Sequence, residues 1–216
     1  MSNIKTIKDC VFGDHDSYEI LEKIVTGVLP FPHESIGKTG IILYGLPGTG
    51  KTTLAPYLCE WIEYANSSEQ LAIPEQFIGV ITSDSVKSIK RINAGTSTIS
   101  QNESRVHYYV LDEADQLSPK AMKSLKTIMG TRSNIVLVMT TNYLTSIPED
   151  MQDRCYCINM NAGPVKHYET ALKRIALEEF NCTLPVATIQ HCASIGNGSW
   201  RTKMTALIVA CTNHGS

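Results

Sequence analysis

The fold of this chain is decided by one stretch, Gly45-Leu46-Pro47-Gly48-Thr49-Gly50-Lys51-Thr52. It fits the pattern G-x-x-x-x-G-K-[ST], in which glycines let successive backbone N–H groups point toward bound phosphates. The short apolar run from Gly40 to Gly45 predicts a strand buried on both faces, and the segment from Thr52 to Tyr64 predicts a helix. A strand, a glycine-rich loop and a helix in this order predict a nucleotide-phosphate site.

Similar apolar runs recur along the chain and predict a parallel sheet. These runs are Phe77–Thr82, Val106–Leu111, Ile135–Thr140 and Cys155–Met160. The segment between each run and the next is long enough for a crossover connection. Five buried strands with interleaved helices favour an α/β fold with a doubly wound sheet. Ahead of the first strand, the apolar spacing between Tyr18 and Val25 predicts one amphipathic helix.

The pattern changes after Asn161-Ala162-Gly163-Pro164, where helices take over. We predict helices over Val165–Phe180 and Thr188–Ile195, and a third that begins at Ser199, a good N-cap residue. The chain is therefore expected to divide into a core, residues 1–162, and a small helical lid, residues 163–216. The polar stretch from Asn93 to Ser104 is predicted to be a mobile loop.

Composition narrows the class of protein. The 216 residues are 43% hydrophobic and 19% charged, which is typical of soluble globular domains. A formal net charge of −2 argues against a globally basic nucleic-acid binder, so any DNA contact must be local. Seven cysteines without a C-x-x-C pair predict neither a zinc ribbon nor a disulfide framework. No run approaches the roughly 18 apolar residues of a membrane span, and we expect a cytoplasmic protein without membrane contact.

The glycine-rich stretch supplies the candidate nucleotide ligands. Lys51 is predicted to pair with the β and γ phosphates, and the Thr52 hydroxyl to bind Mg²⁺. ATP and Mg²⁺ are therefore the expected cofactors. The predicted nucleotide-binding residues are Gly45, Leu46, Pro47, Gly48, Thr49, Gly50, Lys51, Thr52 and Thr53.

Polar residues end two of the other predicted strands. Asp112 and Glu113 follow Val106–Leu111, so that Asp112 would hold Mg²⁺ and Glu113 would polarise the water that attacks the γ-phosphate. Asn142 follows the next strand, and strand ends of this fold converge on one crevice. Its amide could thus reach the γ-phosphate or the attacking water. The alternative is an asparagine that merely caps a turn.

The order of these motifs resembles the ATPase subunits of sliding-clamp loaders, which are AAA+ proteins: the small subunits of replication factor C and their phage counterparts. The resemblance runs from about Val11 to Leu207. It implies the strand order 5-1-4-3-2 and a C-terminal helical lid. Beyond the P-loop it rests on four motifs: Asp112-Glu113-Ala114-Asp115, Thr140-Thr141-Asn142, Asp153-Arg154-Cys155 and Gly198-Ser199-Trp200-Arg201.

The resemblance also implies roles for three side chains. Asn142 stands at the position called sensor 1, and Arg201 resembles the sensor 2 arginine of the lid. Arg154 resembles the arginine that completes the ATP site of the adjacent subunit, although Asp153 replaces the serine of the family's Ser-Arg-Cys motif. From geometry, we expect Arg154 to lie at the flank of the domain, beyond the fifth strand, nearer a neighbour's γ-phosphate than its own. The alternative for both arginines is a solvated surface salt bridge.

A basic segment follows the second predicted strand. Thr82 to Arg91 lies where the family has a segment that tracks the DNA backbone, and Lys87, Lys90 and Arg91 share a helical face within it. A second basic stripe is formed by Lys120, Lys123 and Lys126. Both stripes are candidates for DNA contact, with an ordinary solvated surface as the alternative.

These expectations combine into a subunit of a clamp-loader-like ATPase. Its expected partners are other AAA+ subunits, primer-template DNA and a sliding clamp. Family members continue into a helical collar, which is expected to be missing because the sequence ends at Ser216. One alternative is another AAA+ machine, such as a Holliday-junction translocase, an initiator or a transposition regulator. The other is a nucleotide-gated scaffold with negligible turnover.

Overall fold

The structure, a computed structural model, describes residue 4 and residues 6–67, 78–81 and 86–214. Its centre is a five-stranded sheet in which every neighbouring pair is parallel, in the order β2-β3-β4-β1-β5. This is the predicted order 5-1-4-3-2 read from the other edge, so the fold prediction is confirmed. The strands are β1 (Gly40–Tyr44), β2 (Ile78–Ile81), β3 (His107–Leu111), β4 (Ile135–Thr141) and β5 (Cys155–Asn159).

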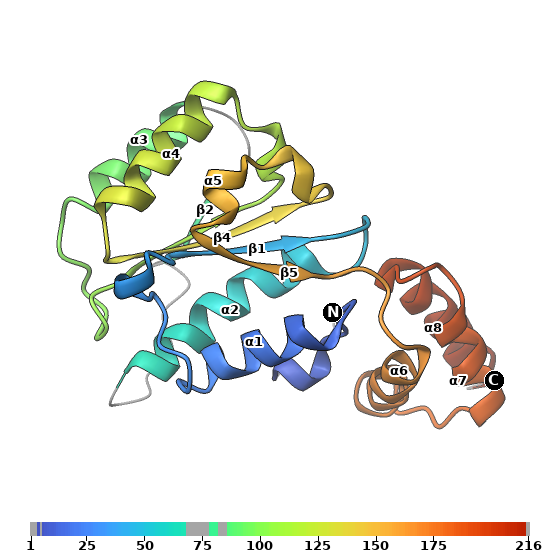
Figure 1. Ribbon diagram of the computed structural model, residues 1–216. Helices are drawn as coiled ribbons and strands as arrows, with labels where there is room; N and C mark the ends of the chain where they lie inside the picture. The colour runs from blue at the N-terminus through green and yellow to red at the C-terminus, as the bar shows by residue number, and fades with distance from the viewer. Residues whose placement is uncertain (1–3, 5, 68–77, 82–85, 215–216) are drawn as a thin grey trace.

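Helices cover both faces of the sheet, as the apolar runs require (Figure 1). One face packs on α1 (His15–Val25) and α2 (Lys51–Asn66). The other packs on α3 (Val86–Gly95), α4 (Pro119–Thr131) and α5 (Glu149–Gln152). All seven residues of β4 are buried, because this central strand is covered from both sides. Short 3₁₀ turns lie at Ile7–Asp9, Glu34–Ile36, Ala114–Gln116 and Leu144–Ser146.

Three further helices pack on one another around an apolar cluster of their own: α6 (Val165–Phe180), α7 (Val186–Ser194) and α8 (Trp200–His214). They lie beyond the carboxyl ends of the strands (Figure 1). Lys203 of α8 is buried among them; its Nζ lies 4.3 Å from the centre of the Tyr168 ring and donates to the carbonyls of Ala193 and Ile195. Within the described ranges, no helix combines the length and the apolar character needed to cross a membrane.

One expectation about the chain was wrong. The stretch from Asn93 to Ser104 is not simply a mobile loop, because Asn93–Gly95 completes α3. Its other end is fixed by the buried carboxylate of Glu63 in α2, which accepts hydrogen bonds from Asn102 Nδ2 (2.9 Å) and from the Ser104 backbone amide (3.1 Å). The polar residues of this stretch are therefore partners of an internal charge.

Candidate functional site

The candidate site lies where β3, β4 and β1 end side by side. Because these neighbouring strands are parallel, the residues that follow them meet at one edge of the sheet. Asp112 follows β3, Asn142 follows β4 and Gly45 follows β1. The loop from Gly45 to Gly50 then leads directly into α2, so the positive end of the helix dipole faces the same edge.

The loop can adopt its shape only with glycines. Gly48 and Gly50 have φ angles of 81° and 97°, in the left-handed region that side chains avoid. A Cβ on Gly45 would lie 2.9 Å from the backbone nitrogen of Asn161. Asn161 also supports the loop directly, since its Oδ1 accepts from the Leu46 amide at 3.0 Å. Sequence reasoning did not identify this residue, which follows β5 and carries no local signal.

Lys51 is the only lysine of the loop and lies at the start of α2, where it is buried. Its Nζ donates to the carbonyls of Gly45 (2.7 Å) and Leu46 (2.8 Å). Burial lowers the pKa of this ammonium group, while the carboxylates of Asp112 and Asp115 act in the opposite direction. The loop thus encloses a cation whose bonds to carbonyls can be exchanged for bonds to phosphate oxygens.

Two oxygen groups at the edge fit a magnesium ion. The Thr52 hydroxyl donates to Asp112 Oδ1 at 2.8 Å, so the two predicted metal ligands are in contact. Mg²⁺ is usually held by one or two protein oxygens together with phosphate oxygens and water. Thr52 and Asp112 provide two such oxygens at this edge.

Glu113 is held in a strained backbone conformation. Its φ and ψ angles are 53° and 51°, a left-handed geometry that costs an ordinary residue roughly 1–2 kcal/mol. The exposed carboxylate accepts from Gln116 Nε2 at 2.7 Å. Such strain concentrates at functional sites, where the surroundings must maintain it. Asn142, the other predicted catalytic side chain at this edge, is half-buried at the start of the loop after β4.

The C-terminal helices contact the same loop through α8. The backbone amide of Trp200, the first residue of α8, donates to Gly48 O at 2.8 Å. Beside this contact lies a cavity of about 110 Å³ whose lining includes Thr49, Thr53, Leu54, Met160, Trp200 and Met204. Asp9 and Arg174, which form an ion pair, also line this small cavity beside the phosphate loop. Of the lining residues, Thr49 and Thr53 were predicted to bind nucleotide, and the rest were not identified from the sequence.

Arg154 lies at the amino-terminal end of the strands, whereas the phosphate loop lies at their carboxyl-terminal end. Arg154 immediately precedes β5, not beyond it as expected, and its carbonyl accepts from the amides of Thr39 and Gly40 at 3.1 Å each. Lys38 Nζ donates at 2.8 Å to the carbonyls of both neighbours of Arg154, Asp153 and Cys155. The guanidinium lies against Gly130, where an added Cβ would be 3.6 Å from it. The backbone of this segment is thus firmly fixed.

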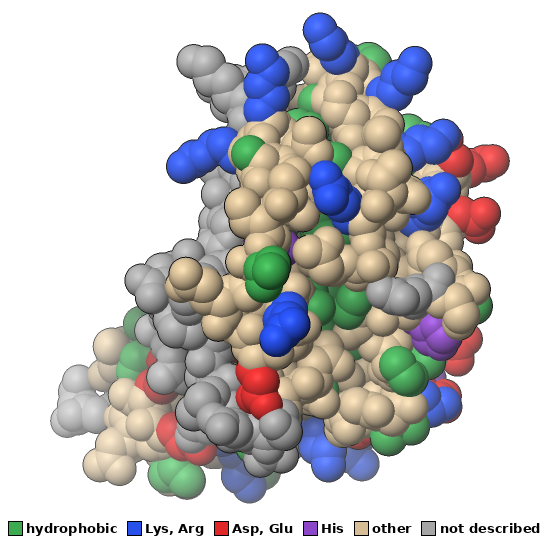
Figure 2. All heavy atoms as spheres, turned by 90° about the vertical axis from the view of Figure 1, so that its left-hand side faces the viewer, with side chains coloured by type: hydrophobic (Ala, Val, Ile, Leu, Met, Phe, Trp, Pro, Cys, Tyr) green, Lys and Arg blue, Asp and Glu red, His purple; other side chains and the backbone are tan. Residues whose placement is uncertain are grey.

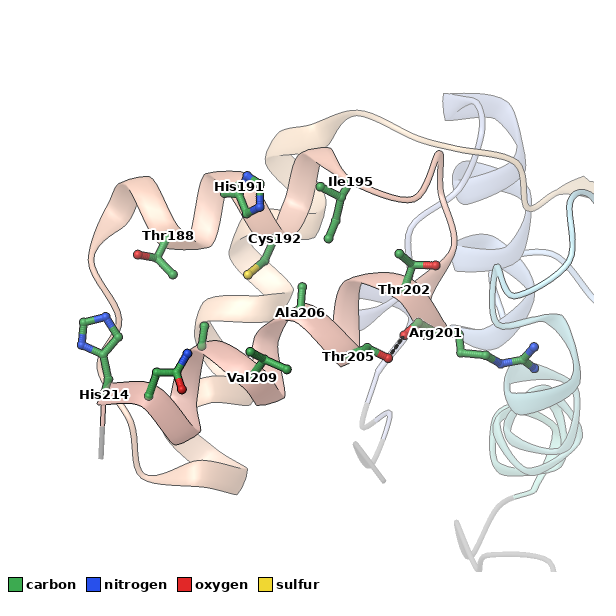
Figure 3. Close-up of a pocket in the computed structure, with 12 residues that line it drawn as sticks. Thr188, His191, Cys192, Ile195, Arg201, Thr202, Thr205, Ala206, Val209 and His214 are labelled. Atoms are coloured by element: carbon green, nitrogen blue, oxygen red, sulfur yellow. Dashed lines mark hydrogen bonds between the residues drawn. The ribbon is translucent and has the colours of Figure 1, made fainter. Parts of the chain in front are cut away.

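Arg201 is the second residue of α8, directly after Trp200, and is exposed. A groove of about 810 Å³ lies between α7 and α8. In Figure 3 the guanidinium of Arg201 points away from the other residues that line it. No residue of the phosphate loop lines this groove. Neither Arg201 nor Arg154 forms an ion pair with a carboxylate in the described part of the chain.

Basic side chains gather over α3 and α4, in the upper part of the face in Figure 2. Lys90 and Arg91 of α3 are exposed, as are Lys120 and Lys123 of α4. Lys126 pairs with Asp150 and is less available. The predicted segment begins at Thr82, and its residues 82–85 and the side chain of Lys87 lie outside what the structure describes.

A parallel sheet with a phosphate loop between β1 and α2 defines the class of P-loop ATPases. A family model described as the ATPase family associated with various cellular activities (AAA) matches residues 41–160, more than half of the chain. The chain therefore belongs to the AAA family. Among curated proteins the comparison finds no match.

Solved structures of other proteins share the fold. A variant of RuvB from Thermotoga maritima is 17% identical with a TM-score of 0.66, covering 91% of this chain and 61% of that one. A DNA polymerase III gamma subunit-related protein from Thermotoga maritima is 13% identical with a TM-score of 0.58, covering 90% and 58%. This chain thus spans about three fifths of each. At such identities the likeness shows the fold.

Proposed function

We propose that this chain is a Mg²⁺-dependent ATPase subunit of a clamp-loader-like assembly that acts on primer-template DNA. Residues 1–162 form its core and residues 163–216 its lid. The observation that carries the proposal is the separation of Arg154 from the phosphate loop, because it implies an ATP site shared between neighbouring subunits. The choice of primer-template DNA as the substrate is supported by the motif order, which resembles that of clamp-loader subunits, and by the basic face over α3 and α4.

Within one subunit, the loop amides and Lys51 bind the phosphates. Thr52 and Asp112 hold Mg²⁺, which when bound neutralises charge on the transferred phosphoryl group. Glu113 accepts the proton of the attacking water. The Asn142 amide orients that water or the γ-phosphate. Arg201, the residue directly after Trp200, whose amide bonds to Gly48, carries the state of the nucleotide to the lid.

Arg154 acts on the neighbouring subunit. Gly40 at the start of β1 and Gly45 after its end are five residues apart, which at about 3.3 Å per residue is about 16 Å, farther than an arginine side chain extends. Arg154 is bonded at the first end, and Gly45 follows the second. A cation held there can stabilise phosphoryl transfer only in an adjacent copy whose nucleotide faces it.

DNA contact is assigned to Lys87, Lys90 and Arg91, with Lys120 and Lys123 as a second row. Lysine and arginine on one helical face suit the phosphate backbone and carry no sequence information. This fits a machine that recognises a primed junction by its shape. The same basic face would also serve another DNA-associated AAA+ ATPase, which is the second candidate function.

The test is the rate of ATP hydrolysis per subunit at increasing protein concentration, without DNA, with primed DNA, and with primed DNA plus a sliding clamp. The proposal predicts a rate per subunit that rises with concentration, and rises further with DNA and clamp together. Stimulation by DNA without an effect of the clamp would favour the second candidate. A binding-competent chain with negligible turnover in every condition would indicate a nucleotide-gated scaffold.

A further inference from the structure

One hydroxyl joins the two carboxylate residues of the site. Thr140, the penultimate residue of β4, is buried, and its Oγ1 donates to Asp112 Oδ1 at 2.5 Å. The same oxygen accepts from the backbone amide of Glu113 at 3.0 Å. A hydroxyl has one proton and two lone pairs, so it can make both bonds at once. Strands β3 and β4 are thus joined at their ends by a side chain as well as by their ladder.

The two bonds have different effects. The bond to Asp112 occupies Oδ1, which also accepts from Thr52, and leaves Oδ2 without a hydrogen bond to any described residue. The carboxylate is therefore fixed in orientation with one oxygen available as a ligand. The bond from the Glu113 amide helps to maintain the left-handed backbone that turns this residue out of the strand direction. A valine in place of Thr140 would keep the packing and lose both bonds.

We propose that Thr140 is a positioning residue for the reaction: it sets the candidate Mg²⁺ ligand Asp112 and the candidate base Glu113 in a fixed relation. The inference rests on the proposed function. Gln116 Nε2 donates to Glu113 and the Thr52 hydroxyl donates to Asp112, whereas the Thr140 hydroxyl bonds to both residues. Partners of metal ligands typically contribute about 10–100-fold to metal affinity or activity, and we assign Thr140 an effect of that size.

The test compares Thr140→Val with Thr140→Ser, which retains the hydroxyl. A fluorescent ATP analogue is titrated with excess EDTA and then at increasing Mg²⁺, and hydrolysis of ATP is followed separately. For Thr140→Val we expect nucleotide affinity in EDTA within about twofold of wild type, about a tenfold higher half-saturating Mg²⁺ concentration, and at least about a tenfold lower kcat. Thr140→Ser should recover most of both losses.

Thr39→Val is the matched control, because Thr39 is equally buried, its hydroxyl has no hydrogen-bond partner among the described residues, and it lies at the other end of the sheet. Thermal unfolding in EDTA monitors folding of each variant. Thr140→Val and Thr140→Ser with wild-type half-saturating Mg²⁺ would overturn the inference and leave the proposed function intact. A wild-type chain without Mg²⁺-dependent nucleotide binding would overturn both. If Thr140→Val does not fold, Thr140→Ala takes its place in the comparison with Thr140→Ser: a higher half-saturating Mg²⁺ concentration for Thr140→Ala alone supports the inference, and equal values for the two variants contradict it.

Discussion

Arg154 and Gly45 lie at opposite ends of β1. The carbonyl of Arg154 accepts from the Gly40 amide at 3.1 Å, where the strand begins, and Gly45 opens the phosphate loop where it ends. The cation and the loop of one chain therefore cannot act on the same phosphate. Under the proposed function, Arg154 therefore acts on the nucleotide of a neighbouring subunit.

The first prediction separates binding from hydrolysis. Glu113→Gln should bind ATP with nearly wild-type affinity and hydrolyse it at least about a hundredfold more slowly, because general-base contributions are of order 10²–10⁴. Lys51→Ala should lose binding itself, because the buried cation is the main charge of the loop. Titration of a fluorescent nucleotide and a phosphate-release assay measure the two effects. Wild-type turnover in Glu113→Gln would remove this residue from catalysis.

The second prediction concerns DNA. Replacing Lys87, Lys90 and Arg91 together by alanine should weaken binding to primed DNA and lower its dependence on salt, because fewer counterions are released. Nucleotide affinity should stay the same. A matched control removes three exposed lysines from α1 and α6: Lys23, Lys166 and Lys173. Equal losses in the two triple variants would point to net charge, and an unaltered affinity and salt slope would return the α3 face to an ordinary solvated surface.

The third prediction concerns stability. The buried Glu63 carboxylate accepts from Ser67, Asn102, Ser104 and Tyr108, which come from three separate segments. Glu63→Ala would leave several of these donors buried without a partner, at roughly 1–3 kcal/mol each, so the free energy of unfolding should fall by about 3 kcal/mol or more. The exposed pair Glu19–Lys23 offers the control, since Glu19→Ala should leave the free energy of unfolding nearly unchanged. Chemical denaturation measures the free energy of unfolding of both variants. If it falls by similar amounts in the two, the hydrogen bonds of Glu63 contribute little to stability.

The Glu63 cluster also shows why part of the molecule was not predictable. The phosphate loop and the five strands are marked by local patterns: glycine spacing, and apolar runs long enough to cross a covered sheet. Glu63 lies in an ordinary helical segment, and its partners Asn102 and Tyr108 are 39 and 45 positions away. Nothing local distinguishes it from a solvated glutamate, and this is why the stretch near Asn102 was expected to be mobile.

The same division applies to the site. Asp112, Glu113 and Asn142 could be placed at one edge from sequence, because parallel strands end together. Asn161, Trp200 and Thr140 could not be assigned contacts, because each bond joins segments whose approach depends on packing. Arg154 was expected at the flank, and the sequence pattern did not reveal that Lys38 fixes its backbone from the start of β1. Residues at the strand ends could be predicted from the sequence, whereas hydrogen bonds between distant segments could be assigned only from the structure.

The measurement that tests the central claim most directly is a mixing experiment with Arg154→Ala and Lys51→Ala. Arg154→Ala alone should keep its ATP affinity and lose hydrolysis, since arginine fingers supplied in trans are worth roughly 10³–10⁵ in turnover in well-studied GTPases. The control is Arg132→Ala. Arg132 lies at the end of α4 and donates to Ser97, and the variant should hydrolyse ATP as wild type does.

Mixed in equal amounts at a protein concentration where wild type is active, the two inactive variants should regain part of the wild-type rate. The reason is that an intact phosphate loop on one subunit can then face an intact Arg154 on its neighbour. A mixture that is no more active than its separate components, measured where wild-type turnover rises with concentration, would contradict a shared ATP site.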